Sequence, residues 1–462
     1  MLVQSASPYR PAGTLDPSTA LLPYRGPWNA RKAAHLLRRA GFGGSASELA
    51  AFAALSMDGA VDRLIHFPNA GGLPPAPELA DDRPNRALMR AFANANAQGP
   101  QPQNQIVRTF AAPPRPDPLG LSNQMMAEAP MPGATPAAQP AEANPAIKQF
   151  VKNHVANSVA LMQWWLGRMI ATPAPLQEKM TLFWHGHFTT AYQGKGITAQ
   201  DVLRQNQLYR SFALGNIRQL TLAVSQDPAM LKYLDNRASR AEHPNENYAR
   251  ELMELFTLGI GNYTEQDVRE SARAFTGWTI GPGDEFVFNR RFHDEGVKTF
   301  LGRTGNFTGS DIVDIIFQQP AAPKWFATKL LEFFVYSDPE PALVDGVAAL
   351  LKKNNFELAP VMSTLLRSEV FHSERAYRAL VKSPTEFIVG TYKLFGLSEI
   401  APPVLGAMNR MGQRLFYPPN VKGWDGGEAW LNSATLLSRE NFASAVCQNP
   451  DMMRNATWLT QN

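Results

Sequence analysis

Several features that define other protein classes are scarce in this chain of 462 residues. It has one cysteine, Cys447, so neither an internal disulfide nor a cysteine-based zinc finger can form. We expect this thiol to be a small buried residue, because its neighbours in the sequence offer no base. No stretch reaches the roughly 20 apolar residues of a transmembrane helix, and residues 1–26 lack the charged and apolar regions of a signal peptide. These absences favour a cytoplasmic protein without a membrane span.

Charge of one sign is also lacking. The chain has 44 Lys+Arg against 40 Asp+Glu, a net charge of +4. The basic residues are scattered and form no dense run, so we expect no nucleic-acid partner. The hydrophobic fraction of 44% is ample, at this length, for a sizeable core.

Helical periodicity accounts for most of what is present, and no alternation of strand and helix indicates a parallel sheet. The longest predicted helix covers 147–170. Alternation in the string EFVFNRRF predicts a small β-hairpin between Trp278 and Leu301. The expected fold is therefore mainly α, a large multi-helix globular domain with a small β-hairpin and a long Pro/Ala-rich insert. Shorter helices are predicted over 27–40, 45–54, 57–66, 176–184, 199–214, 217–225, 245–257, 265–275, 322–334, 341–354, 358–366, 384–394 and 404–411.

Domain organisation follows from composition. Residues 1–26 form a Pro-rich lead-in, and 27–462 are predicted to be a single large helical domain. Within it, residues 69–144 are rich in Pro, Ala, Gln and Asn and poor in β-branched residues. Such a segment cannot bury much apolar surface, so we expect a low-complexity or partly disordered insert, with a possible helix over 86–97.

Six strings in order carry a resemblance to a known family. They are RKAAHLLRRAGFGG, PLQEKMTLFWHGHF, PNENYARELMELFTLGIGNYTEQDVRESARAFTGW, FHDEGVKTFLG, LVKSPTEFIVG and FYPPNVKGWDGGEAWLNSATLLSRENFA. Together they closely resemble the bacterial family catalogued as domain of unknown function 1800, over residues 25–443 apart from the insert. The resemblance implies a bacterial protein often encoded beside a sulfatase-like partner. It implies no substrate and no catalytic residue.

Histidines within these strings are candidate metal ligands. His185 and His187 are separated by Gly186, which would permit a turn that aims both imidazoles at one ion. Adjacent His293 and Asp294, beside the predicted hairpin, could supply two further ligands. The alternatives are a pair of hydrogen-bonded histidines among aromatic residues and an ordinary surface turn. His35, on an otherwise apolar helix face, is expected to be a satisfied core residue.

Carboxylates on one predicted helix form the second group of candidates. Glu251 and Glu254 are three residues apart and share a face of the helix over 245–257. That helix is apolar around much of its circumference, and buried carboxylates cost several kcal/mol unless paired or metal-bound. Pairing with Arg250, Arg269 and Arg273 is the alternative to metal ligation.

Taken together, the His, Glu and Asp residues predict a site for a divalent metal ion, with zinc, manganese or iron suited to its mixed nitrogen and oxygen ligands. The expected function is a metal-dependent enzyme, with hydrolysis the first choice and oxidation open. A spare carboxylate would act as general base toward metal-bound water. The candidate metal ligands are His185, His187, Glu251, Glu254, His293 and Asp294, and the candidate catalytic residues are Glu251, Glu254 and Arg250.

An aromatic, glycine-rich string near the C-terminus offers a different function. Trp424, Asp425 and Trp430 could form a platform for a sugar ring or another planar ligand. The alternative is a rigid loop that packs over the core. The second expected function is therefore a non-catalytic protein with a structural metal or an ion-pair core that binds a glycan or a protein partner.

Overall fold

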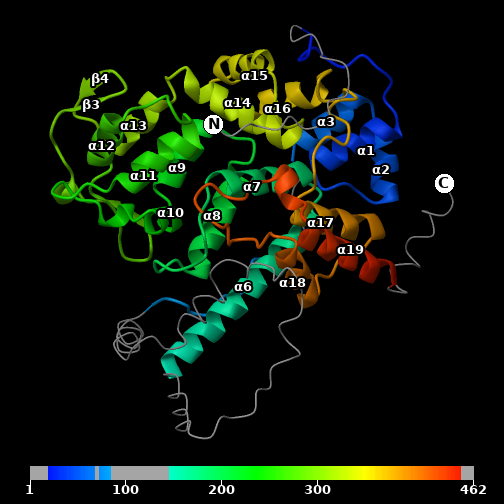
Figure 1. Ribbon diagram of the computed structural model, residues 1–462, viewed down its shortest axis with the longest axis horizontal. Helices are drawn as coiled ribbons and strands as arrows, with labels where there is room; N and C mark the ends of the chain where they lie inside the picture. Colours follow the sequence, from blue (N-terminus) through cyan, green and yellow to red (C-terminus); the bar gives the residue numbers. More distant parts are fainter. Residues whose placement is uncertain (1–18, 68–71, 85–144, 449–462) are drawn as a thin grey trace, which may run out of the picture.

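The computed structural model describes residues 19–67, 72–84 and 145–448. Helices dominate these residues, with two short antiparallel strand pairs, so the predicted mainly α fold is confirmed (Figure 1). The predicted helix over 86–97 lies outside the described residues, as does most of the Pro/Ala-rich insert.

The first helices form a layer on one side of the molecule, blue in Figure 1. Side chains begin them: Asn29 caps the first, and Ser45 forms a capping box with Glu48 in the second. The preceding segment is tied to the C-terminal half, because Tyr24 N donates to Arg367 O at 2.8 Å. The helices are α1 (Ala30–Arg39), α2 (Ala46–Ala53) and α3 (Met57–Ile65).

The middle of the chain adds a longer series of helices, and α6 projects from the body of the molecule (Figure 1). Two of them, α10 and α13, with six and eight residues, were not expected from the sequence. The series consists of α6 (Pro145–Ala171), α7 (Pro175–His187), α8 (Ala199–Ser211), α9 (Ile217–Ser225), α10 (Pro228–Tyr233), η1 (Asn236–Ala238), α11 (Glu246–Glu251), η2 (Leu252–Thr257), α12 (Glu265–Ala274) and α13 (Gly309–Ile316).

One predicted helix is divided. The segment 245–257 is α-helical only as far as Glu251 and continues as a π-helix, η2. A π-helix bonds each N–H to the carbonyl five residues back, which widens the turn. The α-helical spacing used to align Glu251 with Glu254 therefore does not hold across this junction.

The strands lie between α12 and α13. The predicted hairpin is present as β1 (Trp278–Ile280) paired with β2 (Phe286–Phe288), with Thr279 opposite Val287. The turn η3 (Arg290–Phe292) follows. A second pair, β3 (Lys298–Phe300) with β4 (Arg303–Gly305), places Thr299 opposite Thr304.

The C-terminal half closes the fold against its beginning. Helix α16 packs on α3, while α17 and α18 pack on α6. Near the end of α19, Cys447 is exposed, contrary to the expectation of a buried thiol. The elements are α14 (Ala321–Phe334), α15 (Pro341–Lys353), α16 (Leu358–Arg367), α17 (Pro384–Phe395), α18 (Pro402–Arg410), η4 (Gly427–Trp430) and α19 (Ser433–Gln448).

Helix α7 lies between two hydrophobic clusters and contributes to both. Phe183 and Trp184 belong to the larger cluster, while Leu182 belongs to the cluster around α6, α17 and α18. Almost every side chain of α7 is buried as a result. In the part of the chain that the structure describes, no helix is both long and apolar enough to cross a membrane.

Part of the Pro/Ala-rich insert packs on the fold. Residues 72–84 run without helix or strand beside α6, where Asn157 bonds both the N–H and the carbonyl of Ala80 at 2.9 Å. Trp164 Nε1 donates to Pro74 O at 3.2 Å. Asp82 is buried and accepts hydrogen bonds from the Tyr192 hydroxyl and from Ala199 N, the first residue of α8. Side chains of the helices thus hold this segment.

Candidate functional site

His185 and His187 lie inside the last turn of α7 rather than on a turn at Gly186. Residues two apart on an α-helix differ by about 200° around its axis, so the two rings diverge. His185 Nε2 accepts from Phe416 N at 3.2 Å, on the C-terminal loop. His187 Nε2 donates to Phe256 O at 2.8 Å, in the last turn of η2. Burial lowers the pKa of each to about 3, so both are neutral.

Glu251 and Glu254 are half-buried. Burial and, secondly, the nearby charge of Glu254 raise the pKa of Glu251. Glu254 accepts from the Tyr263 hydroxyl at 2.8 Å. Arg250 pairs instead with Glu246 and Glu265, at 3.2 and 2.7 Å. The structure therefore keeps the two acids near each other without the arginine partner considered for them.

The His293–Asp294 pair belongs to a separate network beside the strands. Asp294 accepts from Arg273 Nε at 2.7 Å, and this guanidinium lowers the pKa of the Asp294 carboxyl. His293 Nδ1 lies 2.9 Å from Thr276 O, and its buried Nε2 has no hydrogen-bond partner among the described residues. The guanidinium of Arg273 therefore balances this aspartate.

The structure does not bring the predicted ligands together. Across residues 19–67, 72–84 and 145–448, no three side chains of His, Cys, Asp or Glu are grouped so that they could hold a metal ion. His187 contacts the backbone of η2 at Phe256, whereas His185 faces the opposite side of α7. Helical geometry separates His185 from His187, and the contacts of His293 and Asp294 with Thr276 and Arg273 hold that pair in a separate network.

The loop that contains Trp424, Asp425 and Trp430, which we call the tryptophan loop, packs over the C-terminal end of α7. Trp424 is half-buried, with its ring centroid 5.7 Å from that of His185, and Trp430 is buried. Asp425 is exposed and pairs with Lys422 at 2.7 Å. Trp430 therefore offers little ring surface to a ligand.

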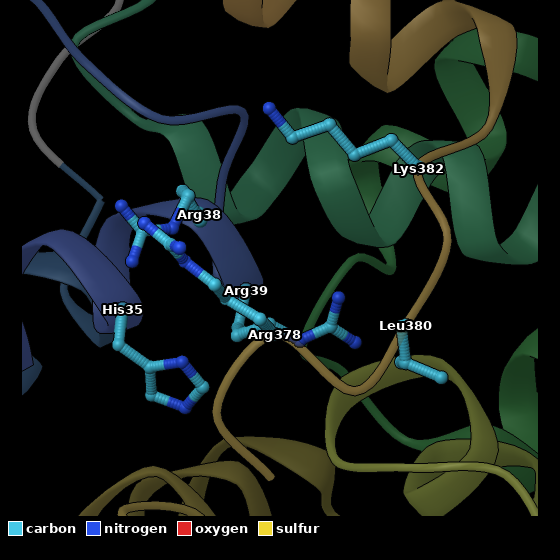
Figure 2. A pocket seen from close by; sticks show the side chains of 6 residues that line it. All are labelled: His35, Arg38, Arg39, Arg378, Leu380 and Lys382. Atoms are coloured by element: carbon cyan, nitrogen blue, oxygen red, sulfur yellow. The ribbon is translucent and has the colours of Figure 1, made fainter. Parts of the chain in front are cut away.

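A cavity of about 290 Å³ where α1 meets the loop between α16 and α17 was not anticipated. Its lining from α1 consists of His35, Arg38 and Arg39, which the spacing i, i+3, i+4 places on one face. The loop between α16 and α17 adds Arg378, Leu380 and Lys382. Figure 2 shows these six side chains on α1 and on the loop that passes beside it. We call these six residues the cationic pocket.

The local sequence explains how α1 presents these side chains. The helix ends at Arg39, and Gly43 follows with a φ of 89°. A Cβ on Gly41 would lie 2.9 Å from Cβ of Pro175, so only glycine lets the chain pass this close to α7. Arg39 then reaches the C-terminal end of α14, where its Nε and Nη2 donate to Phe334 O and Phe333 O at 3.1 and 2.6 Å.

Positive charge exceeds negative charge behind the pocket. The carboxylate there belongs to Glu386, which forms an ion pair with buried Lys179. Burial alone would raise the pKa of Glu386, but the charges of Lys179 and Arg39 lower it to about 2. Burial also lowers the pKa of Arg39 to about 10 and lowers that of Lys179. One carboxylate thus faces several cations.

Donor groups in and beside the pocket remain unused. Arg38 Nη2 and Arg439 Nε are buried without a hydrogen-bond partner in the described part of the chain. Arg378 sits at the exposed rim with a φ of 58°, a conformation that costs energy for a residue with a side chain. Unpaired donors and a strained residue at one cavity are features of ligand sites.

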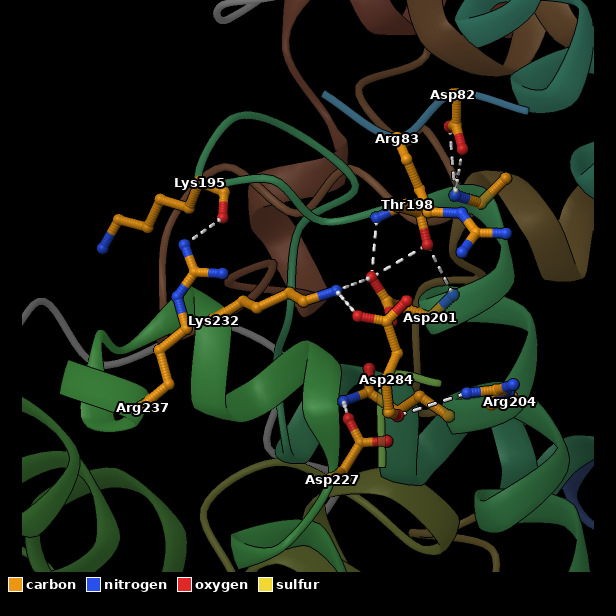
Figure 3. Close-up of polar contacts among 12 residues, drawn as sticks. Asp82, Arg83, Lys195, Thr198, Asp201, Arg204, Asp227, Lys232, Arg237 and Asp284 are labelled. Atoms are coloured by element: carbon orange, nitrogen blue, oxygen red, sulfur yellow. Dashed lines mark hydrogen bonds and ion pairs between the residues drawn. The ribbon is translucent and has the colours of Figure 1, made fainter. Parts of the chain in front are cut away.

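A second polar cluster, shown in Figure 3, surrounds the start of α8. Asp201 closes a capping box with Thr198 and accepts from Lys232 Nζ at 2.7 Å. Lys232 also reaches Asp284 at 3.2 Å. Asp227 is buried close by, and burial raises its pKa to about 7, with a contribution from Asp201. Buried Asp201 Oδ1 has no hydrogen-bond partner among the described residues, but Lys232 already balances this carboxylate, so the cluster has no excess of charge comparable to that of the cationic pocket.

One feature of the sequence pointed to residues of the cationic pocket. His35, Arg38 and Arg39 fall in RKAAHLLRRAGFGG, and Lys382 falls in LVKSPTEFIVG, two of the strings that carried the family resemblance. His35 is buried as expected and its Nε2 lies 2.8 Å from Phe371 O. Its place in a cavity lining could not be read from the sequence, because the other wall is more than 300 residues away.

Comparison with known proteins supports the resemblance over nearly the whole chain. No curated protein and no solved structure matches this chain. The profile of one family, described as "Protein of unknown function (DUF1800)", matches residues 35–461. That span includes both walls of the cationic pocket, and the chain therefore belongs to the DUF1800 family.

Proposed function

We propose that this protein binds a small anionic molecule in the cationic pocket. The observation that carries the proposal is the lining: three arginines and a lysine with no acidic side chain among the six residues. Arginine and lysine donors form strong, charge-assisted hydrogen bonds with phosphate, sulfate and carboxylate groups. The exposed Arg378 and Lys382 leave the pocket accessible from solvent.

Buried cations without full compensation are costly, and an anion would reduce that cost. Arg38 and Arg39 come from the same helix turn and repel one another, which contributes to the lowered pKa of Arg39. A bound anion would accept from the unused Arg38 Nη2. Ligand binding would therefore stabilise the folded chain.

Calorimetric titration with inorganic phosphate and sulfate, at low salt, tests this function. Arg378→Gln removes one rim charge and is expected to weaken phosphate binding about tenfold, equivalent to about 1.4 kcal/mol. Arg410→Gln, on the exposed face of α18 and outside the pocket, is the matched control and should bind as the natural chain does. Absence of binding by both anions, or equal affinities for the two variants, would contradict the proposal.

The metal-dependent hydrolase remains a separate prediction, as do the glycan and the sulfatase-like partner. Each predicted ligand except half-buried Glu251 has a protein hydrogen bond or ion pair that a metal would have to replace or share. Metal content of the purified protein, compared between the natural chain and His187→Gln, tests it. A stoichiometric ion lost in that variant would favour the metal enzyme over the anion-binding protein.

A further inference from the structure

We propose that the ligand of the cationic pocket is a phosphomonoester dianion with a hydroxyl group on its carbon skeleton, that is, a small polyol or sugar phosphate. This inference rests on the proposed function and names the ligand class of the same site. Three properties of the pocket support it: its size, its charge and the one acceptor in its lining.

Size favours a molecule larger than a bare inorganic ion. The cavity of about 290 Å³ lies near the lower end, about 300 Å³, of sites that hold small organic molecules. A single tetrahedral anion held by Arg38 and Arg39 would leave the space toward Leu380 and Lys382 unfilled. A short carbon skeleton attached to the anion would occupy it.

Charge favours a dianion. Arg38, Arg39, Arg378 and Lys382 line the cavity, and Lys179 lies behind it. Lys179 and Arg39 are partly balanced by Glu386, and the guanidinium of Arg39 also contacts the negative C-terminal end of α14. Arg38 and Arg378 have no acidic partner in any ion pair of the described residues, and Lys382 has none within ion-pair distance, although the charge of Glu386 also acts on Lys382. A phosphomonoester carries about two negative charges near neutral pH, whereas a sulfate ester or a carboxylate carries one.

The acceptor is His35. Its Nε2 lies 2.8 Å from the carbonyl oxygen of Phe371, which can only accept, so Nε2 carries the hydrogen. Burial lowers the pKa of His35 to about 3, and Arg39 contributes, so the ring is neutral and Nδ1 has a free lone pair. In Figure 2 the ring lies beside the arginine side chains that line the pocket.

An acceptor in a lining of donors selects for a ligand donor. The fully ionised phosphate group has no hydrogen to offer, so it cannot use His35 Nδ1. A hydroxyl on the adjacent carbon skeleton can donate to Nδ1 while the phosphate accepts from Arg38 and Arg39. One molecule then satisfies both kinds of group in the pocket.

Titration calorimetry at pH 8 tests the ligand class with three probes of equal carbon number. Glycerol 3-phosphate carries the dianion and hydroxyls, propyl phosphate carries the dianion alone, and propyl sulfate carries one charge. We expect glycerol 3-phosphate to bind about fivefold more tightly than propyl phosphate, the value of one net hydrogen bond. Propyl sulfate should bind about tenfold more weakly than propyl phosphate, because it has one charge fewer.

Two substitutions of His35 distinguish the roles of its two ring nitrogens. The amide of glutamine reaches the position of Nε2 and can keep the bond to Phe371 O, but it leaves no acceptor at Nδ1. The shorter asparagine places its amide near Nδ1. We expect His35→Gln to remove the preference for glycerol 3-phosphate over propyl phosphate while propyl phosphate still binds, and His35→Asn to retain part of the preference.

The outcomes distinguish this inference from the proposed function. Failure of all three probes and of inorganic phosphate would remove both. Phosphate binding without a hydroxyl preference, or with a preference that survives His35→Gln, would overturn the ligand class and leave anion binding intact. Equal affinity for propyl phosphate and propyl sulfate would overturn the inference that the ligand is a dianion. Thermal unfolding of each variant without ligand identifies any substitution that acts by unfolding the pocket.

Discussion

Buried polar groups are neutral and hydrogen-bonded at one end of α7 but charged and only partly compensated at the other. At its C-terminal end, His185 and His187 are neutral and each forms a hydrogen bond with a backbone group. At its N-terminal end, buried Lys179 carries charge next to Arg39, with Glu386 as their shared partner. The first region is close to balanced, whereas the second has an excess of positive charge that extends into the cationic pocket.

The comparison shows which kind of buried polar group indicates that a ligand binds nearby. Histidines suggested chemistry in the sequence, yet a neutral ring can be satisfied by a single carbonyl or N–H. An arginine cannot give up its charge in a protein, so a buried one needs an anion. Uncompensated cations are thus the stronger evidence of an absent partner molecule.

The largest expected effect comes from breaking the charge balance behind the pocket. Glu386→Gln keeps the capping-box position at the start of α17 but leaves Lys179 and Arg39 without their carboxylate. Removing one partner of a buried ion pair costs about 3–5 kcal/mol. Urea unfolding measures this loss, and added phosphate should restore part of it.

Glu374→Gln is the control for that experiment. Its carboxylate pairs with Arg31 at 2.6 Å, but the Glu374 side chain is 67% exposed. Exposed pairs contribute about 0–1 kcal/mol. Equal losses for Glu386→Gln and Glu374→Gln would show that the cations of the pocket do not depend on a buried carboxylate.

A buried acid that is not paired with a cation provides the opposite case, because its pKa is raised instead of lowered. Burial raises the pKa of Asp227 to about 7, whereas cations lower that of Glu386 to about 2. A raised pKa means that the folded chain holds the proton more tightly than the unfolded chain, whose aspartates titrate near 3.9. The stability from Asp227 is therefore present below about pH 4 and is lost as pH rises to about 7.

Asp227→Asn removes this titration. We expect the natural chain to lose more stability than Asp227→Asn between pH 4 and 7, by on the order of a few kcal/mol. Urea unfolding across this range measures the difference in slope. Asp345→Asn, at an exposed pair with Lys324, is the control and should follow the natural chain. Parallel curves for the natural chain and Asp227→Asn would contradict the raised pKa.

Local patterns in the sequence predicted several capped helices well, although α19, with 16 residues, was not predicted. The predicted segment 217–225 matches α9, and 265–275 matches α12, whose start has a capping box from Thr264 and Asp267. Apolar spacing and caps are local, so one sequence suffices for them. The π-helix η2 was missed, because the apolar spacing of this segment is read with the period of an α-helix.

Sites depend on contacts between distant segments, and here the sequence predicted less. A His-x-His string can converge on an ion in an extended or turning chain but diverges on a helix, and α7 continues through both histidines. The cationic pocket joins residues 35–39 with residues 378–382, and no local pattern shows that they meet. The basic face of α1 was visible, but a basic face is usually solvated.

The smallest expected effects are in the tryptophan loop, where two substitutions separate a packed loop from an exposed platform. A Cβ on Gly423 would lie 2.7 Å from Gly186 O, and the φ of Gly423 is 89°. Gly423→Ala should therefore strain the contact with α7 and cost about 1–3 kcal/mol, the range for overpacking. Asp425→Asn removes a pair with Lys422 in which both side chains are 67% exposed, so it should cost about 0–1 kcal/mol. Thermal unfolding of both variants measures the contrast. A reversed order would mean that the exposed edge of the loop, rather than its contact with the end of α7, maintains its conformation.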